Sequence, residues 1–322
     1  MTIVGFHASH EQIAPARLLH AVQRAEEAGF DAAMCSDHFE PWSVRQGESG
    51  YAWSWLGAAL QATRLPFGVV TAPGQRYHPA IAAQAIATLE SMFPGRFWAA
   101  LGSGEAVNEH VTGEPYPPKD ERDSRLRETV TVIRRLLAGE EVSTDGLIRV
   151  DRARIWSLPP VPPPLIGAAV STETARECAE WADGLITVDQ PRDALRAVID
   201  AYRDAGGHGP TAVQVHLSWA PTDEEALAIA HDQWRTGVLP GPAIWEIDRP
   251  EAFDAATAEA TPDDVARTVQ VSSDPARHLE RLSELVDVGF DRIFLHHVGT
   301  EQDAFIDAFG EHVVPALKVV GR

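Results

Sequence analysis

The sharpest chemical signal in this sequence is the pair Asp37-His38, which is followed four residues later by Trp42. A histidine whose proton is controlled by its neighbours is the usual general base for removing a proton from a hydroxyl group. Trp42 could supply an apolar wall or an indole donor beside that imidazole. The alternative is a partly buried histidine bonded to a backbone carbonyl, and the pattern alone leaves both interpretations open.

A second candidate is the glycine-rich run Gly102-Ser103-Gly104-Glu105. Glycines let a ligand approach the backbone closely and point amides at it. The run is weak as a nucleotide motif, because it lacks the GxGxxG spacing and the lysine of a phosphate-binding loop. Glu105 could act as an acid or could cap the following turn, and its chemistry favours neither.

The stretch from Gly167 to Thr172 is expected to open a helix, so its free amides and the Ser171 and Thr172 hydroxyls form a candidate anion site. The alternative is an ordinary helix cap, since the third residue after Ser171 is Thr174 and not the glutamate of a capping box.

Metal and Schiff-base chemistry are both disfavoured. Five histidines raise the possibility of a metal: His10, His38, His78, His296 and His297. None has zinc-like spacing on an expected helix and no carboxylate cluster joins them, so we predict no metal site. The only lysines are Lys119 and Lys318, which excludes a Schiff base unless one of them lies in the site.

The scaffold follows from the hydrophobic period, because short β-rich runs alternate with longer amphipathic runs. The expected strands are 3–7, 31–35, 65–70, 97–101, 165–169, 184–188, 213–220 and 291–297. The expected helices are 15–28, 53–62, 79–92, 122–137, 172–181, 192–205, 223–234 and 275–288. Such alternation implies parallel strands with right-handed crossovers, and eight units favour a closed (β/α)8 TIM barrel, one domain over residues 1–322.

Two inserts interrupt the repeat, after strands 4 and 7. Residues 139–164 hold an expected β-ribbon at 141–150, and residues 237–271 are polar with prolines and acids. Long inserts in a barrel usually cover the active face or form subunit contacts. The chemistry of such barrels lies on the loops after the strands, so we expect His38 and Glu105 to converge there.

Composition limits the partners and the location. A formal net charge of -20 disfavours nucleic acids and anionic membrane surfaces. Cys35 and Cys178 lie in apolar stretches without metal or CxxC spacing, so we expect core residues in a reducing compartment. The first residues carry no signal-peptide pattern, which favours the cytoplasm.

Several motifs occur together in a familiar order. They are Ala8–Gln12, Ser36–Trp42, Arg76–Ala80 with Gln84–Leu89, Phe93–Arg96 and Gly102–Glu109. In this order they resemble the F420-dependent glucose-6-phosphate dehydrogenase branch of the luciferase-like monooxygenase superfamily, which has a sister group thought to use FMN. The similarity covers nearly the whole chain, down to Gly289-Phe290-Asp291.

The resemblance implies a luciferase-like barrel, commonly a homodimer, with a deazaflavin across the strand ends. His38 would take the substrate's hydroxyl proton while a hydride passes to coenzyme F420, and Trp42 would support the charged intermediate. Glu105 would serve the ring nitrogen or the substrate.

The resemblance also implies ligand contacts. The cofactor-binding set is Asp37, Val69, Val70, Ala72, Ser103, Gly104, Asn108, Val170 and Ser171. The substrate-binding set is Glu11, Trp42 and His297. The peptide between Val69 and Val70 would be cis, a bond that costs several kcal/mol outside proline.

Departures from the family set the expected substrate. The segments Thr187–Gln190 and Ala266–Val269 carry no lysine, so a phosphate dianion would face Asp189 with little to neutralise it. We therefore expect a neutral alcohol or carbonyl compound and not glucose 6-phosphate. Ala169-Val170 replaces a double glycine, which leaves the contact to the cofactor's phosphate open.

Two alternatives stay open. One is an FMN-dependent oxidoreductase or monooxygenase of the same superfamily. The other is a flavin-binding barrel without catalysis, against which His38 and Glu105 argue because both are retained.

Overall fold

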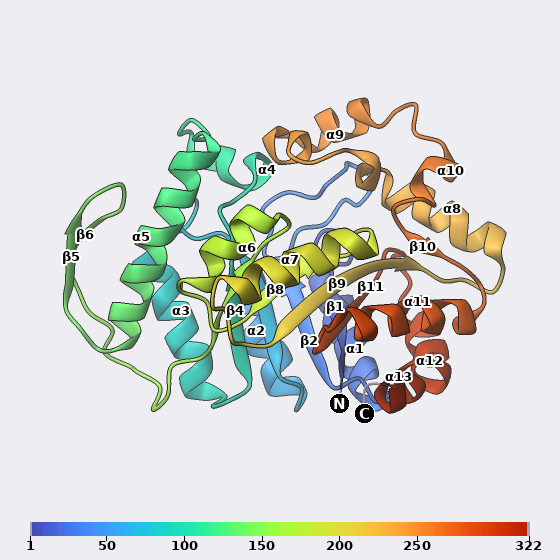
Figure 1. Ribbon diagram of the computed structural model, residues 1–322, viewed down its shortest axis with the longest axis horizontal. Helices are drawn as coiled ribbons and strands as arrows, with labels where there is room; N and C mark the ends of the chain where they lie inside the picture. Colours follow the sequence, from blue (N-terminus) through green and yellow to red (C-terminus); the bar gives the residue numbers. More distant parts are fainter. Residues whose placement is uncertain (1, 321–322) are drawn as a thin grey trace.

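Apolar, β-rich runs form the eight parallel strands of a closed barrel in the computed structural model, which describes residues 2–320 (Figure 1). They are β1 (Ile3–Ala8), β2 (Ala32–Ser36), β3 (Phe67–Thr71), β4 (Phe97–Leu101), β7 (Leu165–Ala168), β8 (Leu185–Val188), β9 (Thr211–Ser218) and β11 (Arg292–His297). Neighbours pair in this order, and β11 pairs with β1 to close the barrel. The predicted fold class is confirmed.

Helices follow the strands and cover the outside of the barrel (Figure 1). Those expected from the sequence are α1 (Pro15–Glu27), α2 (Ala52–Ala62), α3 (Pro79–Met92), α5 (Lys119–Leu137), α6 (Thr172–Ala179), α7 (Arg192–Asp204), α8 (Asp223–Gln233) and α11 (Pro275–Val288). The sequence analysis missed α12 (Asp303–His312) and α13 (Val314–Val320) after the last strand. Phe305, Ile306 and Phe309 of α12 are buried, so this helix completes the outer layer.

Alternate residues of each strand face the helices and the barrel interior. The interior cluster includes Met34, Trp98 and Phe294. Two glycines make room for these rings, because a Cβ atom on Gly5 would lie 2.3 Å from the Phe294 ring and one on Gly68 would lie 1.9 Å from the Trp98 ring. The alternation decides which strand residues can face a ligand.

The two inserts lie in different places (Figure 1). The first is an antiparallel ribbon of β5 (Val142–Asp145) and β6 (Arg149–Ala153), which lies beside α5 at one end of the molecule. The second contains η2 (Arg235–Val238), η3 (Ala243–Glu246), α9 (Pro250–Ala256), α10 (Pro262–Val265) and β10 (Gln270–Val271), which pairs with β9. Since α9 lies above the carboxyl ends of the strands, the second insert covers the predicted active face.

The predicted cis peptide between Val69 and Val70 is wrong. Among the described residues, only the Gly241–Pro242 peptide is cis. Val69 and Val70 instead continue the regular register of β3 with β2 and β4 on both sides. Such a regular strand is built from trans peptides, which avoids the cost of a non-proline cis bond.

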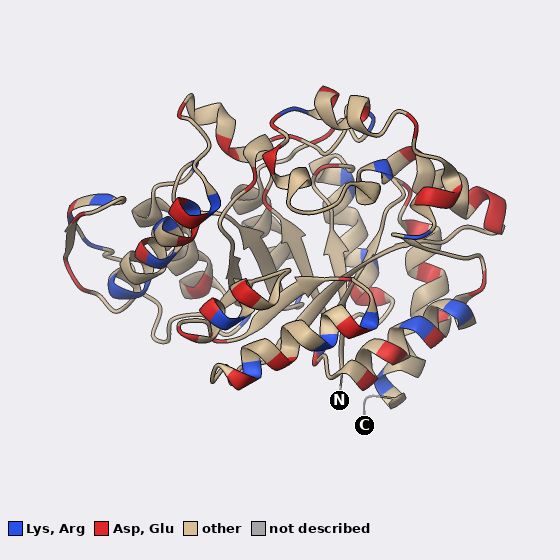
Figure 2. Cartoon of the chain, turned by 45° about the horizontal axis from the view of Figure 1, so that its top comes forward, with Lys and Arg blue, Asp and Glu red and all other residues tan. Residues whose placement is uncertain are grey.

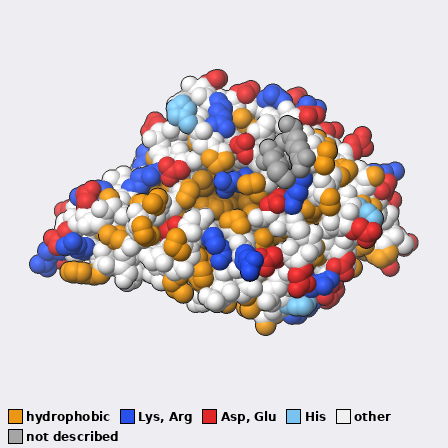
Figure 3. All heavy atoms as spheres, turned by 90° about the horizontal axis from the view of Figure 1, so that it is seen from below, with side chains coloured by type: hydrophobic (Ala, Val, Ile, Leu, Met, Phe, Trp, Pro, Cys, Tyr) orange, Lys and Arg blue, Asp and Glu red, His pale blue; other side chains and the backbone are white. Residues whose placement is uncertain are grey.

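Charged side chains gather on the outer helices and loops, whereas the strands are almost free of them (Figure 2). At the amino ends of the strands, Figure 3 shows a hollow with apolar side chains at its centre. A cavity of about 380 Å³ at this end is lined by Ile3, Arg203 and Arg292, among others. Within residues 2–320, no helix combines the length and the apolar character needed to cross a membrane.

Both cysteines are buried and free, as expected for small core residues. Lys119 pairs with Asp123 and Lys318 pairs with Asp31, so neither lysine belongs to the polar loops at the strand ends.

Candidate active site

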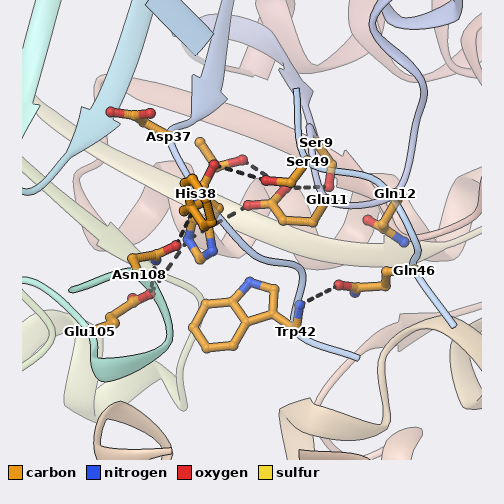
Figure 4. A network of polar contacts seen from close by, with 12 residues as sticks. Ser9, Glu11, Gln12, Asp37, His38, Trp42, Gln46, Ser49, Glu105 and Asn108 are labelled. Atoms are coloured by element: carbon orange, nitrogen blue, oxygen red, sulfur yellow. Dashed lines mark hydrogen bonds and ion pairs between the residues drawn. The ribbon is translucent and has the colours of Figure 1, made fainter. Parts of the chain in front are cut away.

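The loops after β1, β2 and β4 bring two carboxylates to one imidazole (Figure 4). His38 Nε2 lies 3.5 Å from Glu105 Oε2 and 3.6 Å from Glu11 Oε1. The predicted convergence of His38 and Glu105 is confirmed. Glu105 precedes α4 (Ala106–Glu109) but makes no side-chain capping bond there, so its carboxyl group is directed to the histidine.

The His38 ring is not bonded to a backbone carbonyl. Its Nδ1 atom is buried and has no hydrogen-bond partner within residues 2–320. The backbone carbonyl of His38 accepts a hydrogen bond from the Ser49 hydroxyl at 2.9 Å. The Trp42 ring lies 4.9 Å from the imidazole at an angle of 51°. The side chain is 12% exposed, so a ligand can reach it. This arrangement favours the catalytic interpretation over the structural one.

The two carboxylates differ in their tendency to hold a proton. Burial opposes ionisation of Glu11, but the His38 imidazole and the Ser36 hydroxyl outweigh it and hold the pKa of Glu11 at about 2. Burial raises the pKa of Glu105, although His38 opposes the shift. Glu11 is therefore held as an anion, whereas Glu105 takes up a proton more readily. Neighbouring carboxyl groups whose pKa values differ in this way can serve different roles in acid–base chemistry.

Asp37 faces away from this cluster. Its carboxylate accepts hydrogen bonds from Trp53 Nε1 at 3.1 Å, Thr71 Oγ1 at 2.8 Å and the Tyr77 hydroxyl at 3.0 Å. The side chain is fully buried among these donors, and a cofactor contact of Asp37 stays a prediction. Asp37 anchors the strand ends from behind, and its carbonyl accepts a hydrogen bond from Arg76.

Asn108 joins the two loops that carry the cluster. Its Oδ1 accepts from the Phe39 amide at 2.8 Å, and its Nδ2 donates to Glu105 Oε2 at 3.2 Å. Both ends of the amide thus help to position the loops, and the predicted cofactor contact of Asn108 stays a prediction.

Gly104 and Glu109 form a tight contact after β4. Gly104 has φ +90°, and a Cβ atom there would lie 3.2 Å from the Glu109 side chain. Burial raises the pKa of Glu109 to about 7, and its Oε2 accepts from the Arg76 amide. Ala72 and Ser103 line a small cavity of about 20 Å³ beside Glu109. The sequence analysis assigned no role to Glu109.

The two valines of β3 face opposite sides. Val69 is fully buried among the residues that pack under the helices, whereas Val70 packs against the interior cluster. The prediction of a cofactor contact is therefore corrected for the Val69 side chain and stays a prediction for Val70.

The loops after β7 and β8 offer fewer free groups. Ser171 caps α6 by accepting from the Thr174 amide at 3.2 Å, as an ordinary helix cap does. Val170 beside it is 39% exposed, and the anion site at these two residues stays a prediction. Asp189 pairs with Arg281 at 2.8 Å, a contact that the sequence analysis did not anticipate.

His297 lies on the outer side of β11. Its ring stacks on Phe305 of α12 at 4.9 Å, and its Nδ1 is 3.4 Å from the Trp219 amide. The prediction that His297 contacts the substrate is corrected, because the alternation of the strand turns the neighbouring His296 inward instead.

The second insert forms an aromatic roof over Trp42, which the sequence analysis missed. The Trp42 ring lies 5.3 Å from Phe253 and 6.3 Å from Trp245. Two ion pairs hold the roof: Arg45 with Asp254 at 2.8 Å, and Arg122 with Glu246 at 3.0 Å. In the described part of the chain, no group of three or more His, Cys, Asp or Glu side chains is placed to hold a metal ion.

Comparison with known proteins gives a consistent family. Residues 1–292 match the family model for luciferase-like monooxygenases. The chain is 34% identical to an F420-dependent glucose-6-phosphate dehydrogenase of Intrasporangium calvum, with 99% of each chain covered. It is 35% identical to an F420-dependent hydroxymycolic acid dehydrogenase of Mycobacterium tuberculosis, covering 98% of this chain and 88% of that protein.

A solved structure is similar over the same length. It is an F420-dependent secondary alcohol dehydrogenase in complex with an F420-acetone adduct, and it superposes with a TM-score of 0.90 at 30% identity. The alignment covers 98% of this chain and 99% of that one.

Proposed function

Because this chain belongs to the luciferase-like monooxygenase family, we propose that it transfers a hydride between coenzyme F420 and a neutral alcohol or carbonyl compound. The single observation that carries the proposal is the imidazole of His38 between the Glu11 and Glu105 carboxyl groups under an aromatic roof. The relatives described above are F420-dependent oxidoreductases, which supports the choice of cofactor.

The residues beside Glu105 fit a planar ring. The positions that face the interior at the ends of β3, β4 and β7 are small: Ala72, Gly102 and Ala168. A Cβ atom on Gly102 would meet only the Ala168 Cβ, at 3.7 Å, so the backbone at this strand end is open to a close approach. The deazaflavin ring, when bound, supplies the carbon that exchanges a hydride with the substrate.

The chain's own groups manage the proton. Oxidation of an alcohol removes a hydride from the carbinol carbon and a proton from its oxygen. His38 Nε2 receives that proton, and the Glu11 anion at 3.6 Å stabilises the imidazolium that forms. Burial raises the pKa of Glu105, which favours its protonated form 3.5 Å from the same Nε2 atom, and Trp42 shields the imidazole from water.

The surroundings favour a neutral, apolar substrate. Trp42, Trp245 and Phe253 form the roof, and the arginines that hold the roof are already paired with carboxylates. A phosphate dianion would have to break one of these ion pairs, which costs more in a partly buried site than on the surface. Two of the relatives are named for hydroxymycolic acid and for secondary alcohols.

The test is a substrate comparison with purified protein. Oxidised F420 is mixed with propan-2-ol, with a longer secondary alcohol or with glucose 6-phosphate, and loss of its visible absorbance is followed. We expect reduction with both alcohols, a lower KM for the longer one, and none with the sugar phosphate. Glucose 6-phosphate as the better substrate, or tight binding of FMN with none of F420, would overturn the proposal. A homodimer and a cytoplasmic location are part of the same proposal.

A further inference from the structure

Three histidines meet inside the barrel, close to the Glu11 carboxylate. They come from β1, β9 and β11: His7, His216 and His296. The His7 and His296 rings lie 4.6 Å apart, and the Nδ1 atoms of His216 and His296 are 3.0 Å apart. Burial lowers the pKa of His7 to about 4, of His216 to about 3, and of His296 well below its usual range, so all three rings are neutral near pH 7.

The partners of Gln12 fix where the protons of these rings are. Gln12 Nε2 donates to the Val298 carbonyl, so its Oε1 is the atom that faces His296 Nε2, at 2.7 Å. Because Oε1 can only accept, the single proton of neutral His296 is on Nε2. Its Nδ1 then accepts from His216 Nδ1–H. The result is a hydrogen-bond chain with one direction, from His216 through His296 to Gln12.

The same chain continues to the loop that carries Trp42. Gln12 Nε2 lies 3.4 Å from Gln233 Oε1, and the Gln233 carbonyl accepts from Gln46 Nε2 at 3.0 Å. Gln46 Oε1 accepts from the Trp42 amide at 2.8 Å. Gln12 also directly follows Glu11, whose carbonyl accepts from the Glu48 amide at 3.1 Å. Two buried glutamines, Gln12 and Gln46, and the half-buried Gln233 thus tie the barrel interior to two of the loops that form the site.

We propose that Gln12 and His296 are positioning residues: their hydrogen bond holds the loop after β1 so that Glu11 stays beside His38, and through Gln233 and Gln46 it fixes the backbone at Trp42. Gln12 follows Glu11, whose carboxylate lies 3.6 Å from the His38 imidazole. Gln12 can therefore fix the position of that carboxylate without contacting the reacting atoms. This inference rests on the proposed function, because it assigns the parts of that same site.

The first experiment compares variants that keep or remove the bond. Gln12→Met and His296→Met retain approximate size but remove it, whereas His296→Gln retains a side-chain N–H donor. We expect kcat/KM for F420 and a secondary alcohol to fall about 100-fold in the two Met variants, as for a small misplacement of catalytic groups. His296→Gln should restore most of the activity.

A double variant and a matched control separate positioning from simple destabilisation. If the two residues act through one bond, Gln12→Met with His296→Met loses no more than either change alone. His278 of α11 is as buried as His296, and its Nε2–H donates to the Ser272 carbonyl at 3.0 Å. We expect His278→Met to lower Tm as much as His296→Met does but to leave kcat/KM unchanged.

The second readout does not depend on turnover. Hydrogen exchange of the peptide covering residues 42–48 reports the amides of Trp42 and Glu48, and we expect it to be about fivefold faster in Gln12→Met and unchanged in His278→Met. Unchanged exchange together with unchanged kcat/KM, or strictly additive losses in the double variant, would overturn the inference. If the parent protein turns over no alcohol with F420, the proposed function fails, while the exchange measurement still decides the positioning role.

Discussion

The loops of the first half of the barrel differ from those of the second half in how their polar groups are satisfied. After β1, β2 and β4, His38 Nδ1 has no partner within residues 2–320, and two carboxylates share the other ring nitrogen at 3.5 and 3.6 Å. After β7 and β8, Ser171 caps a helix and Asp189 is paired with Arg281. Polar residues are present at both places, but Ser171 and Asp189 are engaged within the chain, whereas His38 Nδ1 has no partner among the described residues.

This difference shows where chemistry can occur. A group that already has a good partner must break that bond before it can bind a ligand, which costs free energy in a buried site. A buried group without a partner gains from the ligand instead. We therefore expect the first half to hold the reacting groups of the proposed site and the second half to support their positions.

The largest expected effect is on His38. We expect His38→Ala to lower kcat/KM about 10²- to 10⁴-fold, because a general base contributes a factor of this size. His297→Gln, a change to a histidine that the structure places outside the cluster, should stay within a factor of about three. Steady-state kinetics with F420 and a secondary alcohol measure both. If kcat/KM falls equally in His38→Ala and His297→Gln, the proposed difference between the two halves of the barrel is wrong.

The next effect concerns the buried carboxyl group of Glu109 in the first half. Burial raises its pKa from 4.5 to about 7, so between these values the folded protein holds a proton that the unfolded chain has released. The free energy of unfolding therefore falls as pH rises from 4.5 to 7, by on the order of 3 kcal/mol for this group.

Glu109→Gln should remove that part of the pH dependence, which urea unfolding at pH 5 and pH 8 measures. The amide oxygen can still accept from the Arg76 backbone amide, so the local contact is retained. If the free energy of unfolding of the variant depends on pH as steeply as that of the parent protein, other groups cause the dependence.

The smallest effect is expected at Ser171 in the second half. Loss of its capping bond in Ser171→Ala should lower stability by about 1 kcal/mol and leave the Kd for F420 unchanged. Thermal unfolding and a fluorescence titration with F420 measure the two quantities. If the Kd rises about tenfold, the Ser171 hydroxyl binds the cofactor's phosphate and the second half contributes more than support.

Much of the barrel and of the reacting cluster could be predicted from the sequence. Parallel strands place their carboxyl ends at one edge, so polar residues after strands 1, 2 and 4 had to meet. Side chains alternate between the two faces of a strand, but this alternation does not tell which of the two sets faces the barrel interior. The sequence analysis therefore chose His297 where the structure turns His296 inward, and it grouped Val69 with Val70 although they face opposite sides.

Contacts between distant segments could not be read from the sequence. Arg281 lies 92 residues from Asp189, and Glu246 lies 124 residues from Arg122, so neither ion pair has a local pattern. The aromatic roof depends on how the second insert folds back over Trp42, which its polar composition does not reveal. The same holds for Asp37, whose three donors come from separate segments.

The central claim is that the site moves a hydride between the carbinol carbon of a neutral alcohol and F420. The most direct test incubates the protein and oxidised F420 with propan-2-ol deuterated at carbon 2 and analyses the reduced cofactor by mass spectrometry. We predict one deuterium in the reduced cofactor and a slower reaction than with the unlabelled alcohol. Reduced cofactor that contains only solvent hydrogen, or no reduction by any secondary alcohol, would contradict the account.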